Sequence, residues 1–190
     1  MVNVKKLLLD SIETKLAVAT NTQLVRLIDT AGHHLIKALQ RGNQILVAGN
    51  GGSAADAQHF AAELAGKFLS PTRRPLPATA LTVNTSNLTA IGNDFGYEYV
   101  FSRQLEGQGN PGDVFIGITT SGNSPNILEA FKIAREKHIL TIGLLGGDGG
   151  QAKNQCDLAI VVPSSETPRI QETHTTLVYI LYASVDEAFS

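Results

Sequence analysis

The chain has 190 residues, a length typical of a single domain with its own hydrophobic core. Fifteen Lys and Arg against seventeen Asp and Glu give a net charge of −2, so no basic field indicates a nucleic-acid partner. The single cysteine, Cys156, excludes an internal disulfide and is typical of a reducing compartment. No apolar run reaches the roughly 18 residues of a membrane span, and the first residues lack a signal-peptide core. We therefore expect a cytoplasmic protein that does not associate with membranes.

The first 41 residues predict two helices. Leu8, Ile12 and Leu16 recur at helical spacing in the first, and a similar pattern continues through the second. Asn21-Thr22 is a plausible break between them, and Gly42 suits the left-handed position after a helix end. A helical pair of this length cannot bury both of its faces on one five-stranded sheet. We therefore expect residues 1–41 to pack against another subunit.

From residue 44 onward, short apolar runs alternate with helical segments. The runs are continuous rather than alternating, which is typical of parallel strands covered by helices on both faces. The expected strands are 44–48, 78–83, 113–118, 139–145 and 158–162, and the expected helices lie near 53–67, 86–93, 97–107, 124–137, 149–154 and 167–189. The predicted fold class is α/β, a three-layer sandwich with a five-stranded parallel sheet, over residues 42–190. No linker or repeat divides the chain, so residues 1–190 are expected to form one domain.

A glycine-rich loop follows the first predicted strand and opens a helix. Gly49, Gly51 and Gly52 permit a tight turn and a close approach of the backbone to a ligand. Ser53 is a good N-cap, and Asp56 makes a variant of the capping box. The loop lacks the spacing of a dinucleotide motif and the lysine of a P-loop, so it favours neither ligand. The alternative is a well-capped helix after a turn.

A second polar loop follows the third predicted strand. Thr119, Thr120, Ser121 and Ser124 place four hydroxyls within six residues, and Pro125 fits the first helical position. Hydroxyls and free backbone amides at a helix N-terminus can satisfy the oxygens of a phosphate. Both loops would lie at the carboxyl ends of neighbouring parallel strands, where open α/β sheets bind ligands. A purely structural turn is the alternative.

The helix after the first loop carries a polar stripe. His59, Glu63 and Lys67 are spaced by four residues and therefore lie on one face. Glu63 could act as a general base, and His59 and Glu63 could share a metal ion. The alternative is a solvated face, although the other residues of this helix are mostly small and apolar.

The head of the last helix carries a further polar cluster. Gln171 and His174 are three residues apart, about 60° from each other around the helix. A charged and amide-rich helix start can equally be a helix cap.

Taken together, these motifs resemble the bacterial phosphoheptose isomerases, one-domain members of the sugar isomerase (SIS) group with a flavodoxin-like fold. The resemblance covers nearly the whole chain and rests on segments 49–53, 56–64, 92–96, 121–124 and 169–172. It implies a homotetramer that converts sedoheptulose 7-phosphate to D-glycero-D-manno-heptose 7-phosphate through an enediol. The product feeds heptose and lipopolysaccharide biosynthesis.

The resemblance also implies roles for individual residues. Asn50 and Asp94 contact the sugar, Glu63 moves the proton between C1 and C2, and Gln171 orients the substrate. The substrate phosphate is held in the loops by Gly51, Gly52, Ser53, Thr119, Thr120, Ser121 and Ser124. Lys67 stands where the family often has arginine, which keeps the charge but loses the bidentate fork. A zinc ion would be bound by His59, Glu63 and Gln171.

One position departs from the family pattern. Eight residues after Gln171 the family usually has a histidine, a second acid–base group and zinc ligand, whereas this chain has Tyr179. A phenol has a reference pKa near 10, so at neutral pH it can donate a proton but is a poor base. Tyr179 could serve as the acid, or His174 could take the missing role. Alternatively, the chain is a non-catalytic SIS-domain scaffold, like the replication-initiation regulator that binds DnaA.

Overall fold

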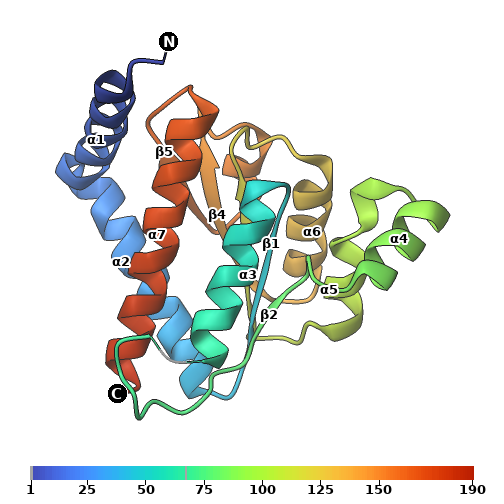
Figure 1. Ribbon diagram of the computed structural model, residues 1–190. Helices are drawn as coiled ribbons and strands as arrows, with labels where there is room; N and C mark the ends of the chain where they lie inside the picture. Colours follow the sequence, from blue (N-terminus) through green and yellow to red (C-terminus); the bar gives the residue numbers. More distant parts are fainter. Residues whose placement is uncertain (1, 67) are drawn as a thin grey trace.

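The computed structural model describes residues 2–66 and 68–190, and its centre is a parallel sheet between two layers of helices (Figure 1). The sheet has five strands in the order β2-β1-β3-β4-β5. These strands are β1 (Ile45–Gly49), β2 (Ala78–Ala80), β3 (Val114–Thr119), β4 (Leu140–Gly146) and β5 (Leu158–Val162). The predicted fold class is confirmed.

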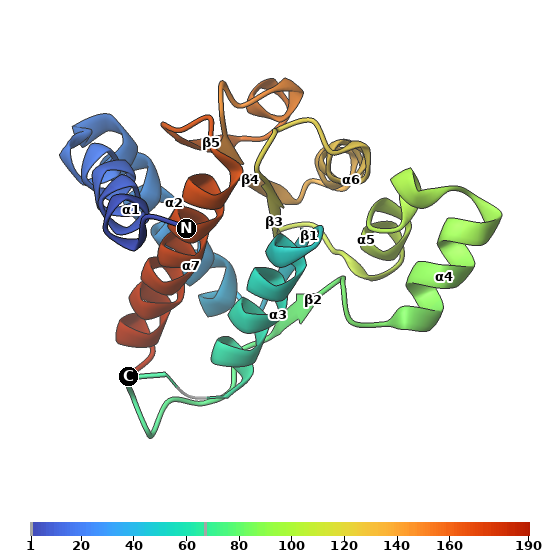
Figure 2. The same cartoon turned by 45° about the horizontal axis from the view of Figure 1, so that its top comes forward.

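Helices cover both faces of the sheet (Figures 1 and 2). One face carries α2 (Thr22–Gln40), α3 (Gly52–Ala65) and α7 (Thr167–Ala188), with α1 (Val4–Thr20) outside them. The other carries α5 (Ser102–Gln108), α6 (Pro125–Glu136) and the short η2 (Gln151–Asn154), with α4 (Thr85–Asp94) and η1 (Tyr97–Tyr99) beyond them. Successive strand residues alternate between the two cores, since Ile45 and Val47 join the first and Leu46 and Ala48 the second.

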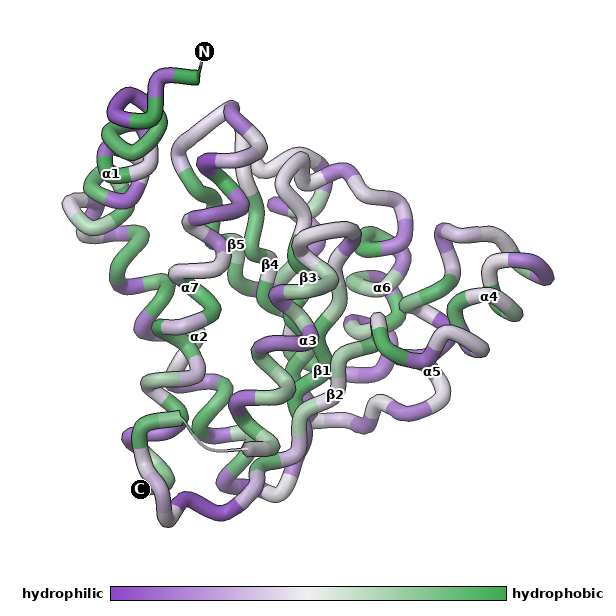
Figure 3. The backbone as a smooth tube through the Cα atoms, viewed as in Figure 1, coloured by the Kyte–Doolittle hydropathy of each residue, from purple (hydrophilic) through white to green (hydrophobic). Residues whose placement is uncertain are grey.

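The N-terminal pair breaks where the sequence predicts. Asn21 ends α1, and its side-chain oxygen accepts hydrogen bonds from the first amides of α2. Gly42 follows α2 with a φ of +83°. Helix α1 leaves apolar side chains in the open, since Leu8, Ile12 and Leu16 are 61%, 60% and 59% exposed. Figure 3 shows these apolar stretches along α1.

Three elements differ clearly from the prediction in extent or type, and the other boundaries lie within two residues of it. Strand β2 spans Ala78–Ala80 rather than 78–83, because the chain turns away after one further hydrogen bond, from Leu81 to Val47. The predicted helix 97–107 is divided into η1 and α5, and the predicted helix 149–154 is the short 3₁₀ helix η2, which begins only at Gln151. Within residues 2–66 and 68–190, no helix combines the length and the apolar character needed to cross a membrane.

Candidate active site

The two polar loops meet at the carboxyl edge of the sheet. Strands β1 and β3 are parallel neighbours, so the loops that follow them lie side by side. The amides of Asn50 and Asn126 join the loops through two reciprocal hydrogen bonds of 2.9 Å each. Asn126 is 2% exposed and was not identified from the sequence, because a pair across strands gives no local signal.

The hydroxyls of the second loop form one cluster. Thr119 Oγ1 lies 2.9 Å from Ser124 Oγ and 3.5 Å from Ser121 Oγ. Ser124 is the N-cap residue of α6 and Pro125 its first residue, as predicted. The Ser124 hydroxyl makes no capping bond, so it can face a ligand at the helix N-terminus. Thr120 is half-buried at the end of β3.

The first loop differs in its capping. Helix α3 begins at Gly52 with Gly51, at a φ of +57°, as its N-cap, so the predicted Ser53 cap is wrong. Ser53 is 4% exposed and its amide donates to Asn50 O. The predicted capping role of Asp56 is wrong as well, because its carboxylate accepts a 2.9 Å hydrogen bond from Thr175 on α7. Burial raises the pKa of Asp56.

Glycine at position 52 has a steric reason. A Cβ built there would lie 1.5 Å from Gln171 Nε2, so the Gln171 side chain lies directly on the start of α3. Helix α7 therefore brings the Gln171 side chain to the glycine-rich loop.

A pocket of about 240 Å³ opens between the two loops and η1. Its lining includes Asn50 and Ser124, together with Tyr97, Glu98 and Asn126, which sequence reasoning missed. The Tyr97 hydroxyl donates to Asn50 Oδ1 over 3.3 Å. The one local signal was the glycine-containing segment that ends at Gly96, whose φ of +108° turns the chain into η1.

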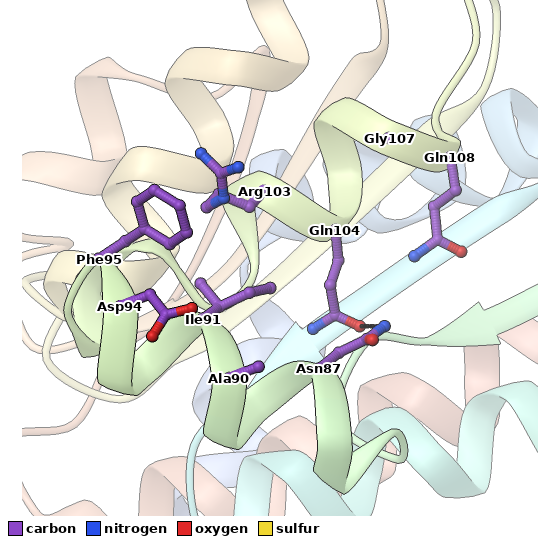
Figure 4. Close-up of a pocket in the computed structure, with 9 residues that line it drawn as sticks. All are labelled: Asn87, Ala90, Ile91, Asp94, Phe95, Arg103, Gln104, Gly107 and Gln108. Atoms are coloured by element: carbon purple, nitrogen blue, oxygen red, sulfur yellow. Dashed lines mark hydrogen bonds between the residues drawn. The ribbon is translucent and has the colours of Figure 1, made fainter.

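Asp94 lies elsewhere in this chain. It lines a separate pocket of about 500 Å³ between α4 and α5, where the Arg103 guanidinium stacks 3.7 Å from the centroid of the Phe95 ring (Figure 4). Its carboxylate accepts a 2.8 Å hydrogen bond from Asn93. No hydrogen bond joins Asp94 to the two loops within the described part of the chain, so its predicted contact with the sugar remains a prediction.

A second group of candidate residues lies between α3 and α7. His59 Nε2 is 3.3 Å from Glu63 Oε1, and both side chains are partly exposed. The Tyr179 ring meets His59 edge-on, with ring centroids 5.0 Å apart. Tyr182 lies beneath them, 5.0 Å from Tyr179 and 5.8 Å from His59 between centroids. The arrangement puts a carboxylate, an imidazole and a phenol at one place on the surface.

Tyr182 is a member of this group that sequence reasoning missed. It is 1% exposed, and its hydroxyl has no hydrogen-bond partner among the described residues. Burial and the neighbouring Tyr179 raise its pKa. Tyr182 therefore stays neutral and supports the rings above it.

The two groups are separated along the helices that carry them. Glu63 is eleven positions after Gly52 on α3, a rise of about 16 Å at 1.5 Å per residue. Gln171 and Tyr179 are about 12 Å apart on α7 by the same measure. Glu63 and the glycine-rich loop therefore lie at opposite ends of α3.

The residues that would bind zinc do not fit it within one chain. His59 and Glu63 come together, but Gln171 lies on Gly52 at the other end of α3. Among the described residues, no group of three or more His, Cys, Asp and Glu side chains could hold a metal ion. The phenol of Tyr179 is a weak replacement for an imidazole ligand.

Two other predicted residues need comment. His174 is 0% exposed and its Nε2 lies 2.9 Å from Leu145 O, which favours the core alternative over an acid–base role. Burial lowers its pKa to about 4. Lys67 lies outside the described residues.

Comparisons with known proteins agree with this geometry. The SIS domain model matches residues 9–146. Phosphoheptose isomerase of Aneurinibacillus thermoaerophilus is 51% identical over 185 residues, which cover 97% of this chain and 93% of the relative. Phosphoheptose isomerase of Nitratiruptor sp. is 58% identical over 162 residues, with 85% and 86% coverage.

Solved structures extend the likeness to three dimensions. Phosphoheptose isomerase from Neisseria gonorrhoeae superposes with a TM-score of 0.90 at 42% identity, covering 97% of both chains. That from Francisella tularensis gives a TM-score of 0.92 at 36% identity, covering 98% of this chain and 100% of the other. At this identity and coverage, the likeness goes beyond the fold. The chain belongs to the phosphoheptose isomerase family of SIS-domain proteins.

Proposed function

We propose that this protein isomerises sedoheptulose 7-phosphate to D-glycero-D-manno-heptose 7-phosphate for heptose and lipopolysaccharide biosynthesis. The observation that carries the proposal is the retained pair of sites, a hydroxyl-rich helix N-terminus and a paired Glu63, in a chain about half identical to phosphoheptose isomerases. We also propose that residues 1–190 form one domain and that the protein is cytoplasmic.

The substrate phosphate binds at the N-terminus of α6. Hydroxyls of Thr119, Ser121 and Ser124 surround that position, and the helix dipole favours the anion. Ser53 and the amides of Gly51 and Gly52 complete the site from the neighbouring loop. Asn50 is fixed by Asn126 beside the sugar chain.

Glu63 and Tyr179 carry the chemistry. Glu63 removes the C1 proton of the ketose while the Tyr179 hydroxyl donates its proton to the carbonyl oxygen at C2, which gives the enediol. Glu63 then returns the proton to C2, and the O1 hydroxyl gives its proton to the deprotonated Tyr179 oxygen as the C1 aldehyde forms. His59 Nε2 lies 3.3 Å from Glu63 Oε1, and this contact orients the carboxylate. Zinc remains a prediction from the resemblance, and these steps use protein groups alone.

The separation within one chain supports a shared site. Because Glu63 lies about 16 Å along α3 from the glycine-rich loop, we propose that it serves a sugar held by the loops of a neighbouring copy. The exposed apolar residues of α1 provide a surface for that association. A homotetramer would account for both the position of Glu63 and the exposed apolar face of α1. The other partner of the protein is its phosphorylated sugar substrate.

Glu63→Gln tests the mechanism directly. We expect turnover of sedoheptulose 7-phosphate to fall by about 10³-fold, since a positioned general base contributes roughly 10²–10⁴. In the same assay, Tyr179→Phe should lower turnover by about tenfold or more. Glu106 is an exposed glutamate on α5, so the control variant Glu106→Gln should turn over substrate at the wild-type rate. Unchanged turnover in Glu63→Gln would refute the mechanism, and assays with added zinc and with chelator determine whether a metal takes part.

A further inference from the structure

A buried ion pair lies in the connection between α3 and β2. The sequence places Arg73 between two prolines in what reads as a surface segment. In the structure its side chain is 0% exposed, and its Nε lies 2.6 Å from Oδ1 of Asp186, whose side chain is 2% exposed. Burying two charges is costly unless every donor and acceptor finds a partner, so this pair needs an explanation.

Arg73 uses all five of its N–H donors. Beyond Asp186, it donates to the carbonyl oxygens of Glu63 and Gly66 over 2.6 and 3.0 Å, and to those of Leu64 and Arg74 over 2.9 and 2.8 Å. Three of these carbonyls lie at the C-terminal end of α3, where they lack helical partners. A cation is also favoured at that end by the helix dipole. Arg73 therefore caps the helix that carries Glu63.

Asp186 completes the arrangement from α7. Its Oδ2 accepts hydrogen bonds from the backbone amides of Leu69 and Ser70 over 3.0 and 2.8 Å. Burial opposes its ionisation, but these bonds and the one from Arg73 hold the pKa of Asp186 below its usual range. The carboxylate thus joins the loop, the α3 end and α7 at one point.

The pair fixes how the face of α3 that carries Glu63 lies against the face of α7 that carries Tyr179. Asp186 is four residues after Tyr182 and seven after Tyr179, so the three share one face of α7. On α3, Glu63 lies in the turn whose carbonyls Arg73 binds, and His59 lies one turn before it. Any slip of α3 along α7 would therefore break the Arg73 contacts and move Glu63 relative to Tyr179.

We infer that the Arg73–Asp186 pair is a positioning device for the isomerisation, which fixes the Glu63 carboxylate relative to the Tyr179 hydroxyl. The inference rests on the proposed roles of Glu63 and Tyr179. Arg73 acts through the α3 backbone and touches no reacting atom. Among the described residues, neither member of the pair hydrogen-bonds to the loop 119–124, so phosphate binding is independent of it.

Arg73→Lys provides the test, because lysine keeps the charge but has three donors on a flexible stem. Well below the unfolding transition, we expect kcat for sedoheptulose 7-phosphate to fall at least tenfold while KM stays within twofold. Amide hydrogen exchange at Gly66 and Leu76, which bond to Ala62 O and Leu64 O, should accelerate. The matched control is Arg74→Lys, the adjacent residue that stacks 5.4 Å from the Phe189 ring, which should leave kcat, KM and both exchange rates unchanged.

Two results would overturn the inference: an unchanged kcat in folded Arg73→Lys, or a loss of activity that matches the unfolded fraction. If Arg73→Lys does not fold, Asp186→Asn gives the same comparison with an isosteric side chain. Wild type and Glu63→Gln are assayed in parallel. Equal turnover of these two would refute the proposed base, whereas the exchange rates still report whether Arg73 orders the end of α3.

Discussion

His174 shows how one buried imidazole can influence stability without taking part in chemistry. Its Nε2 hydrogen-bonds with Leu145 O at the end of β4, while its Nδ1 has no partner among the described residues. A proton on this ring would be a buried charge with no counter-ion. The native state therefore keeps the ring neutral, and its pKa falls to about 4.

This shift predicts a loss of stability in mild acid. Between about pH 6.5 and 4 the unfolded chain binds a proton at His174 that the native chain does not. The contribution is fully present above pH 6.5 and is lost as pH falls toward 4, in total about 3 kcal/mol of unfolding free energy. Urea unfolding at half-unit pH steps should show the unfolding free energy decreasing from pH 6.5 to 4 in wild type. The same slope should appear in His138→Asn, a control at an exposed histidine. His174→Leu should lack it, and a slope that survives in that variant would contradict the argument.

At the scale of elements, the proposed phosphate site depends on where two strands end. The loops after β1 and β3 meet because the strands are parallel neighbours, and Asn50 and Asn126 hold them together. The proposed binding groups are hydroxyls at the start of α6 rather than fixed cations. Phosphate affinity should therefore depend on individual hydroxyls.

Ser124→Ala should raise KM for sedoheptulose 7-phosphate about tenfold, since a hydrogen bond to a charged group contributes about 1.5–3 kcal/mol. The phosphate lies away from the reacting carbons, so kcat should change little, as expected for binding energy equal in the ground and transition states. Steady-state kinetics measure both constants. Ser86→Ala, an exposed serine in the first turn of α4, is the control, and a drop in kcat with unaltered KM would place Ser124 at the chemistry instead.

The helices and strands could be predicted from the sequence, whereas contacts between distant segments could not. Continuous apolar runs predicted the sheet and its helices, because burial on both faces leaves a local pattern in each strand. The start of α3 was misplaced, since Ser53 is a better N-cap than Gly51 by side chain and the positive φ of Gly51 is a backbone property. Tyr97, Asn126 and Arg73 were missed because their partners lie on distant segments. The contact between Glu63 and His59 could be predicted because the two residues are one helical turn apart.

At the scale of the whole molecule, a large apolar surface is left open. Leu8, Ile12 and Leu16 form a stripe on α1, which is held to α7 by a hydrogen bond from Arg169 to Leu7 O. Proteins that remain monomeric rarely expose such a continuous stripe. This surface and the separation of Glu63 from the loops are both explained if copies of the chain assemble and share their sites.

Sharing predicts that two inactive variants restore each other. Glu63→Gln removes the base, and Ser124→Asp places a negative charge where the phosphate binds, so each alone should be inactive. When the two variants are co-expressed in one assembly, some sites combine an intact Glu63 from one copy with intact loops from another. If copies mix at random and each site draws on two copies, a quarter of the sites are intact. We therefore expect turnover of about a quarter of wild type. Adding Ile12→Asp to both should abolish this recovery and reduce the mass measured by light scattering, whereas Glu13→Lys, on the polar side of α1, should do neither. Activity that never recovers in mixed assemblies of confirmed composition would show that each site is built within one chain.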